Sequence, residues 1–200
     1  NIVPADYSKV SLHTQLPSAE KNIDTIREAL AYSGLREIMT NSMTSEKLRS
    51  TLTPQKKPVP ILNPQSSDMS QMRTTLAGSM LEVVSYNINH KNNNNFLFEI
   101  GKTFEYTESG NIREREVIGI VIQGHYINKT WNTAPVPVDF YILKGILEAL
   151  GTHTGIGSLQ FKKDSHETCQ DSSIFSNEYA YVEGNSVNGW AGQCSQKVLD

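Results

Sequence analysis

The hydrophobic pattern between Ile61 and Gln123 restricts this chain to a fold that mixes helices and strands. The short apolar pair Ile61-Leu62 predicts a strand, which ends where Pro64 biases Asn63 away from helical backbone. Five apolar residues then recur at helical spacing and predict a helix: Leu76, Met80, Leu81, Val84 and Ile88. After a polar break at Asn89–Asn95, four more follow the pattern of a strand that ends near Tyr106: Phe96, Phe98, Ile100 and Phe104.

A second strand is predicted at Val117–Ile122, which is a nearly continuous apolar run. The turn residues Glu108–Asn111 separate it from the preceding strand, so we expect the two to form an antiparallel pair. A continuous apolar strand suits a sheet that is covered on both faces. The stretch therefore predicts the order strand, helix, strand, turn, strand.

The segment before this stretch predicts one more helix and one more strand. Apolar residues at helical spacing between Ser18 and Ser33 indicate a helix that ends at Gly34. Leu35–Met43 then reads as a strand. Residues 1–17 are polar with scattered apolar positions, and we interpret them as a linker or an arm.

The segment after the stretch predicts a helix and three strands. Asp139 is placed to cap a helix over Phe140–Leu150, which we expect to end at Gly151. Three short strands are predicted next, the last two joined as a hairpin: Leu159–Phe161, Glu178–Glu183 and Val187–Ala191. The predicted fold class is α+β, an antiparallel sheet flanked by helices.

The composition argues against several functional classes. The 200 residues carry 18 Lys and Arg against 21 Asp and Glu, and this formal net charge of −3 argues against a dedicated nucleic-acid binder. We find no apolar stretch near the roughly 18–20 residues of a membrane span, and no signal-peptide pattern, so we expect a cytoplasmic protein without a membrane partner. The two cysteines, Cys169 and Cys194, lack zinc spacing and are expected to be free thiols, with a single disulfide as the alternative.

Three ordered motifs carry a resemblance to a known family. The first, LNPQSSDMSQMRTTLAGSML, begins at Leu62, the second, FLFEIGKTF, at Phe96, and the third, VDFYILKGILEAL, at Val138. Together they resemble the beta subunit of bacterial phenylalanyl-tRNA synthetase. The resemblance implies a class II aminoacyl-tRNA synthetase-like fold over residues 18–200, as a catalytic-like core module cut from a longer subunit before the third class II motif.

The resemblance also implies a set of structural motif residues. They are Asn63, Pro64, Asp68, Arg73, Thr74, Glu99, Gly101, Asp139 and Lys144. Arg73 is open to two interpretations. It could hold an anion at the end of a strand, or it could anchor the polar Gln65–Ser70 loop through Asp68, and we favour the structural role.

Glu105 argues that the module is not catalytic. Class II synthetases bind ATP with the arginine of a Phe-Arg-x-Glu motif, because a guanidinium stays charged and can hold a phosphate in two places. The comparable segment here is Phe104-Glu105-Tyr106-Thr107, with Glu105 in the position of the arginine. A carboxylate beside a triphosphate is repulsive. We therefore expect no catalytic, cofactor-binding or metal-binding residue in this chain. ATP and Mg²⁺ would be used by the assembled enzyme.

The resemblance implies partners as well. In that family an alpha subunit pairs with beta, a second alpha–beta pair completes an (αβ)2 heterotetramer, and tRNA(Phe) binds to the whole enzyme. The resemblance places the subunit interface on the first helix, at Ile23, Ile26, Arg27 and Leu30.

Other candidate sites are weaker. His90 is expected to close a helix and to suit the dipole at its C-terminus. His125, His153 and His166 are expected in loops without a placed acid or nucleophile, so the sequence does not support a triad. A cluster of four residues could suggest a metal site: Asp164, His166, Glu167 and Asp171. Its spacing matches no known metal-binding loop and favours a solvated surface. Two alternative functions stay open, a free-standing class II-like ATP-dependent ligase and an unrelated interaction domain.

Overall fold

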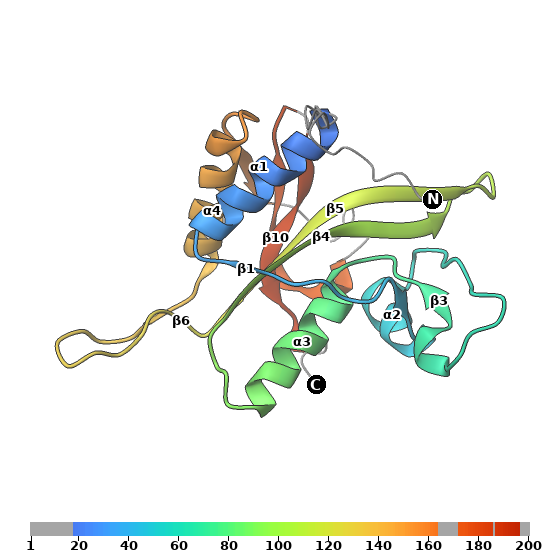
Figure 1. Ribbon diagram of the computed structural model, residues 1–200, viewed down its shortest axis with the longest axis horizontal. Helices are drawn as coiled ribbons and strands as arrows, with labels where there is room; N and C mark the ends of the chain where they lie inside the picture. The colour runs from blue at the N-terminus through green and yellow to red at the C-terminus, as the bar shows by residue number, and fades with distance from the viewer. Residues whose placement is uncertain (1–17, 164–171, 186, 197–200) are drawn as a thin grey trace, which may run out of the picture.

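A long antiparallel strand pair forms the centre of the fold. The computed structural model describes residues 18–163, 172–185 and 187–196. In it, β4 (Asn95–Tyr106) pairs with β5 (Ile112–Gln123) along their full lengths, from Asn95 opposite Gln123 to Tyr106 opposite Ile112. The short strand β1 (Arg36–Glu37) runs parallel to β4 on its other edge (Figure 1). The predicted antiparallel pair is confirmed, and β5 begins five residues earlier than its apolar run.

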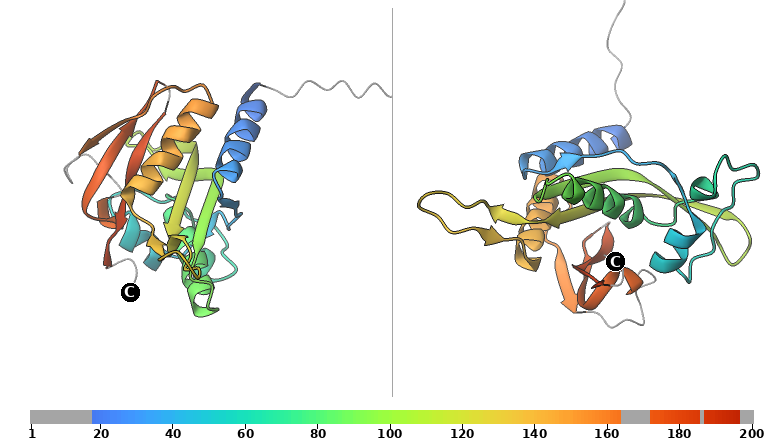
Figure 2. Two further views of the ribbon diagram at one scale, coloured as in Figure 1. Left: turned by 90° about the vertical axis from the view of Figure 1, so that its left-hand side faces the viewer. Right: turned by 90° about the horizontal axis from the view of Figure 1, so that it is seen from below.

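Alternation along β4 sends neighbouring side chains to opposite faces of the sheet. Phe98 is fully buried on one face, where it packs with residues of α1 (Ser18–Tyr32) and α4 (Phe140–His153). Leu97 is buried on the other face, beneath α3 (Ala77–Asn89). Helices α1 and α4 lie side by side over their common face (Figure 2). The sheet is therefore packed on both faces, as its continuous apolar strand predicts, and the α+β prediction is confirmed.

Helix α1 ends in a glycine-centred motif that turns the chain toward the sheet. Gly34 has φ of 86°, a left-handed conformation that costs a residue with a Cβ more than it costs glycine. The N–H of Gly34 donates to the carbonyl of Ala31 at 3.0 Å, and the N–H of Leu35 donates to that of Leu30 at 3.2 Å. Leu30 and Leu35 are both buried in the same core, which is the hydrophobic contact typical of a Schellman ending.

The segment between α1 and α3 differs from its prediction in two places. The expected strand over Leu35–Met43 is present only as β1 and as β2 (Met43–Thr44), with irregular chain between them. The expected strand at Ile61-Leu62 is wrong, because Leu62 is 97% exposed there. Its place is taken by β3 (Gln71–Met72), which pairs with β2. A two-residue apolar run cannot by itself distinguish a strand from an exposed loop.

Two short helical segments complete this region. Helix α2 (Glu46–Leu52) starts at an N-cap, where the Ser45 hydroxyl accepts a hydrogen bond from the Leu48 N–H at 3.2 Å. The 3₁₀ turn η2 (Ser67–Met69) lies in the loop before β3.

Helix α4 starts where the sequence predicts and ends later. The Asp139 carboxylate caps it by accepting from the Ile142 N–H at 2.9 Å. The expected end at Gly151 is wrong, because the helix continues to His153 and the chain turns at Gly155, where φ is 72°. Gly151 is buried, and a Cβ there would lie 2.6 Å from the Gly157 carbonyl oxygen, so this glycine serves close packing.

A second antiparallel sheet follows α4. It comprises β8 (Gln160–Lys163), β9 (Phe175–Glu183) and β10 (Asn188–Cys194), with β9 in the middle and the 3₁₀ turn η3 (Ser172–Ile174) before it. Strand β10 contacts α4. The three predicted strands are confirmed, with β9 starting three residues earlier than expected.

A narrow hairpin projects from the end of β5. It contains the short strands β6 (His125–Ile127) and β7 (Val136–Pro137) and extends away from both sheets (Figures 1 and 2). The predicted linker at residues 1–17 lies outside the described residues. Among the described residues, no helix is long and apolar enough to cross a membrane.

Candidate functional site

Arg73 and Glu99 form a buried ion pair where the first two motifs meet. Arg73 follows β3 and is 4% exposed, and Glu99 lies in the middle of β4 and is 2% exposed. The Arg73 Nη1 donates to the Glu99 Oε1 at 2.7 Å and to the Thr40 hydroxyl at 3.0 Å, while its Nε donates to the Lys102 carbonyl at 2.9 Å. The Thr40 hydroxyl donates to the other carboxylate oxygen of Glu99 at 2.7 Å. Each charge is thus matched by an opposite charge and by further hydrogen bonds, as a buried pair requires.

Gly101 makes room for the guanidinium. A Cβ added at Gly101 would lie 2.4 Å from the Arg73 Nη2 and 3.3 Å from the Glu99 Oε1. Gly101, in the FEIG sequence, is therefore required because the guanidinium approaches its Cα closely. Its backbone conformation is not the reason, since its φ lies outside the left-handed region.

The predicted partner of Arg73 is wrong, although its structural role is supported by the geometry. Asp68 is exposed in η2, and Arg73 pairs with Glu99 instead. Asn63 and Pro64 are also exposed. Sequence distance explains the error, since Asp68 lies five residues from Arg73 while Glu99 arrives from another strand.

Thr74 and Thr53 form a second buried polar contact beside the ion pair. Thr74 is 5% exposed, Thr53 is fully buried, and their hydroxyls lie 2.5 Å apart. This contact holds the end of α2 against the start of the segment that leads into α3. The roles of Thr53 and Thr40 are not predicted from the sequence, because a lone threonine gives no signal that could identify either.

Glu105 occupies a cross-strand ladder of charges. Its carboxylate is 11% exposed and forms ion pairs with the Arg113 Nη2 at 2.9 Å and the Arg115 Nη2 at 3.2 Å, both on β5. Lys102 and Glu114 pair at 2.5 Å on an exposed part of the same two strands. Both arginines near Glu105 are therefore directed at a carboxylate.

The remaining motif residues have structural contacts. Asp139 is the N-cap of α4. The ammonium group of Lys144 lies 3.7 Å from the Glu148 carboxylate and 5.2 Å from the centre of the Phe161 ring, so it ties α4 to β8.

The proposed interface residues on α1 differ in exposure. Leu30 is fully buried in the chain's own core, so the prediction that it contacts a partner is wrong. Ile23 and Ile26 are half-buried. Arg27 pairs with Asp24 at 2.7 Å and with Glu37 at 2.8 Å, and the hydrogen bond to Glu37 raises the pKa of its guanidinium further above its ordinary value.

The described ranges hold one free thiol and no group of side chains placed to bind a metal. Residues 18–163, 172–185 and 187–196 contain no group of three His, Cys, Asp or Glu placed to hold a metal. The candidate group Asp164, His166, Glu167 and Asp171 lies outside the described residues. Cys194 is a free thiol, and burial raises the pKa of that thiol.

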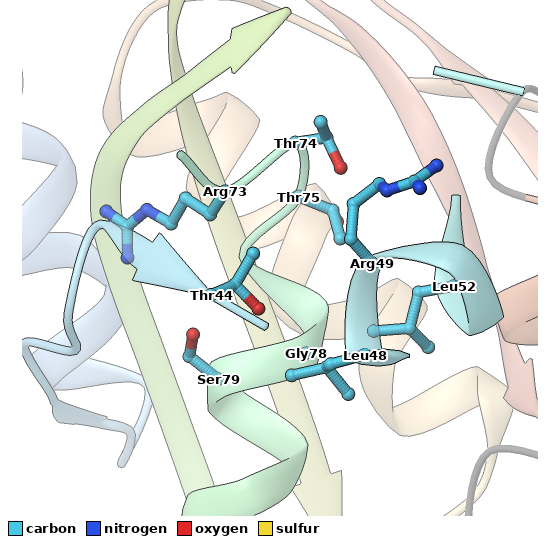
Figure 3. A pocket seen from close by; sticks show the side chains of 9 residues that line it. All are labelled: Thr44, Leu48, Arg49, Leu52, Arg73, Thr74, Thr75, Gly78 and Ser79. Atoms are coloured by element: carbon cyan, nitrogen blue, oxygen red, sulfur yellow. The ribbon is translucent and has the colours of Figure 1, made fainter. Parts of the chain in front are cut away.

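A small cavity adjoins the ion pair between α2 and the start of α3. It has a volume of about 10 Å³, room for roughly one water, and its lining includes Thr44, Arg73 and Ser79. Figure 3 shows the Arg73 guanidinium pointing away from the Thr44 and Ser79 side chains. The cavity is too small for a phosphate, so the alternative role of Arg73 as an anion holder gains no support.

Comparison with known proteins agrees with this arrangement. Residues 3–200 match the family described as the phenylalanyl tRNA synthetase beta chain CLM domain. Phenylalanine–tRNA ligase beta subunits are similar over most of the chain. That of Onion yellows phytoplasma is 30% identical over 92% of this chain and 22% of its own length. That of Yersinia pestis is 35% identical over 76% of this chain and 20% of its own length. The chain thus spans about a fifth of the length of these relatives.

A solved structure shows the fold. Pyrrolysyl-tRNA synthetase from Desulfitobacterium hafniense superposes with a TM-score of 0.62 at 11% identity, over 86% of this chain and 57% of the other. The predicted class II synthetase-like fold is confirmed, and an unrelated interaction domain is excluded by the family match. The chain belongs to the family of phenylalanyl tRNA synthetase beta chain CLM domains.

Proposed function

We propose that this chain is the non-catalytic structural core of a phenylalanine–tRNA ligase beta subunit. In this proposal it pairs with an alpha subunit, and two such pairs form an (αβ)2 enzyme in the cytoplasm that ligates phenylalanine to its tRNA. Alpha would use ATP and Mg²⁺, and tRNA(Phe) would bind to the whole assembly. The family match and the class II fold support this role.

Glu105 is the observation that carries the non-catalytic role. An ATP site at this position needs a cation free to meet the triphosphate. The side chain here is an anion, and Arg113 and Arg115 both form ion pairs with it. Moving either arginine to a nucleotide would break an ion pair and leave a largely buried carboxylate with less compensation. The residues present do not fit a triphosphate.

The rest of the motif set supports a scaffold. In the first two motifs, Arg73, Glu99 and Gly101 are used to join β3, β4 and the chain after β1. A fold that has lost catalysis has no reason to keep substrate-binding charges, but it still needs the contacts that position its elements. The motifs are therefore explained by packing.

Helix α1 is the proposed pairing surface. Its inner side reaches the core through Ala29 and Leu30, while Ile23 and Ile26 are half-buried and Tyr32 is 84% exposed. An exposed tyrosine together with half-buried isoleucines on one helix suits a subunit interface better than free solvent. The family resemblance points to the same helix.

Phenylalanine-dependent pyrophosphate exchange tests the proposal against the alternative of a free-standing ligase. The full-length beta chain alone should give only background exchange, and mixing it with alpha should restore exchange. A Glu105→Ala beta chain should support alpha as well as wild type does. Exchange by beta alone, or its loss in Glu105→Ala, would contradict the non-catalytic role.

A further inference from the structure

The projecting hairpin, residues 124–139, exposes apolar side chains that no packing within the described chain explains. Every residue from His125 to Pro137 is exposed. Trp131 is 96% exposed, Tyr126 58%, Ile127 41% and Val136 40%. The hairpin stands away from both sheets in Figure 1 and in the right-hand view of Figure 2. Large exposed apolar groups gathered on one element mark an interaction site.

The base of the hairpin is firmly attached to the sheet. Asn94 contributes both ends of its amide: its Oδ1 accepts from the His125 N–H at 2.8 Å, and its Nδ2 donates to the Asn128 side-chain oxygen. The Gly124 carbonyl accepts from the Val138 N–H at 3.0 Å. Gly124 has φ of 104°, and a Cβ there would lie 2.2 Å from the Asn93 carbonyl oxygen.

The run of four asparagines, Asn92–Asn95, thus has a structural role at this base. Asn95 is 1% exposed and donates to the Gln123 side chain at 2.8 Å, at the very end of β5. A two-stranded hairpin is marginally stable alone in water. Attachment through Asn94 and Asn95 fixes the direction in which the exposed tip points, and this is useful only if the tip meets another molecule.

We propose that the projecting hairpin docks onto a different protein subunit and inserts Trp131 into an apolar, uncharged pocket of that subunit. The inference rests on the proposed pairing with alpha and adds a second contact in addition to the one proposed on α1. Tryptophan and tyrosine dominate interface energetics, and interface centres are depleted in charged residues. The hairpin has this composition, with Lys129 and Asp139 as its one cation and one anion besides His125.

Nucleic acid is the less suitable occupant. A single lysine and no arginine over sixteen positions cannot neutralise a run of phosphates, which supply most of the affinity for nucleic acid. The aromatic residues could stack on bases, so the experiment includes tRNA as a separate arm.

A second copy of this chain is also less suitable, because neither of two cavities in its described residues suits an indole. The cavity beside Arg73 holds about 10 Å³. Another, of about 210 Å³ at the β9–β10 turn, is lined by polar groups that include Glu183, Asn185 and Asn188. An indole there would cover the Asn185 and Asn188 side chains and offer them only its single N–H in place of water.

Affinity of the purified full-length beta chain for alpha tests the inference. Trp131→Ala should weaken binding by at least about tenfold, as expected for an interface hot spot. Leu62→Ala is the matched control, because Leu62 is 97% exposed in a different loop, and it should bind like wild type. Both substitutions are at exposed positions, so both proteins should keep the wild-type melting temperature.

Fluorescence gives a second measurement. The difference spectrum between wild type and Trp131→Ala isolates Trp131, and it should shift to shorter wavelength when alpha is added. Equal affinity of wild type and Trp131→Ala for alpha would overturn the inference and leave the proposed function intact. A Trp131-dependent response to tRNA alone, or Trp131-dependent self-association, would overturn it in favour of those occupants. Failure of wild type to bind alpha would overturn both proposals.

Discussion

The Arg73 Nη1 lies 2.7 Å from the Glu99 Oε1, and the two side chains are 5% and 2% exposed. The pair connects the end of β3 to the middle of β4, and Thr40 bonds to both partners. Charges buried this deeply destabilise a protein unless each keeps its partner, because neither can regain water. The contact therefore makes the position of β3 depend on the position of the sheet.

Removing one partner of this pair should be strongly destabilising. We expect Arg73→Ala to lower the free energy of unfolding by about 3–5 kcal/mol, because Glu99 would be left buried without its cation. Urea denaturation followed by circular dichroism measures the change. Glu114→Ala is the control, since it breaks the exposed pair with Lys102 and should change stability little. Equal effects of the two substitutions would show that Glu99 is not buried as described.

Gly101→Ala should disturb the same contact from the other side. Its Cβ would approach the Arg73 Nη2 to 2.4 Å, and that nitrogen belongs to a guanidinium fixed by Glu99 and Lys102. We expect a clear loss of stability in thermal denaturation. Gly145→Ala is the matched control, because nothing lies within 4 Å of a Cβ there and Gly145 is in the interior of α4. That change should stabilise by roughly 1 kcal/mol, since alanine favours helix.

The sequence predicts the β4–β5 pair well because local periodicity carries that information. Phe98 and Leu97 alternate in sequence and are buried on opposite faces, so a period of two is enough to place them. The preceding helix, α3, is predicted in the same way, from the helical spacing of Leu76, Met80 and Val84. Register then follows from the turn at Glu108–Asn111, because the two strands leave it opposite each other.

The partner of Arg73 could not be predicted by the same reasoning. Glu99 is 26 residues away in sequence, and only the pairing of β4 with its neighbours brings it near. Periodicity describes which face of an element a residue occupies, but it says nothing about which other element covers that face. The same limit explains Leu30, whose apolar character suited either a core or an interface until α4 was placed against α1.

Phe98 and Glu105 provide a test of strand register. Phe98 is fully buried, so Phe98→Ala should cost roughly 3–5 kcal/mol of stability. Glu105→Ala should cost on the order of 1 kcal/mol, because its partners Arg113 and Arg115 are 42% and 49% exposed and regain water readily. Melting temperatures of the two variants, compared with wild type, measure this difference. Similar melting temperatures would contradict the register of β4.

Cys194 should react slowly with alkylating reagents near neutral pH. Burial raises the pKa of its thiol above the ordinary value of 9.0, so less of the reactive thiolate is present than for a fully exposed cysteine. The folded state holds this proton more tightly than the unfolded state does. The resulting contribution of Cys194 to the free energy of unfolding is therefore fully present below the unfolded pKa and is lost as pH rises through the folded pKa. Iodoacetamide labelling followed by peptide mass spectrometry measures the rate from pH 7 to pH 10. A rate at pH 8 equal to that of a small-molecule thiol would contradict the burial of Cys194.

Helix α1 should gain protection when alpha binds. Tyr32 is 84% exposed, and Ile23 and Ile26 are half-buried, so part of the helix surface is available to a partner while Leu30 holds the helix to its own sheet. We expect slower hydrogen exchange across Ser18–Ser33 in the complex than in the beta chain alone, because docking would suppress local opening of the helix. Hydrogen exchange with mass spectrometry measures this, and α3 is the internal control, since its apolar face already packs on the sheet. Tyr32→Ala should reduce the gain in protection without changing the melting temperature of the beta chain. If alpha binds and residues 18–33 exchange at an unchanged rate, the pairing surface is not on α1.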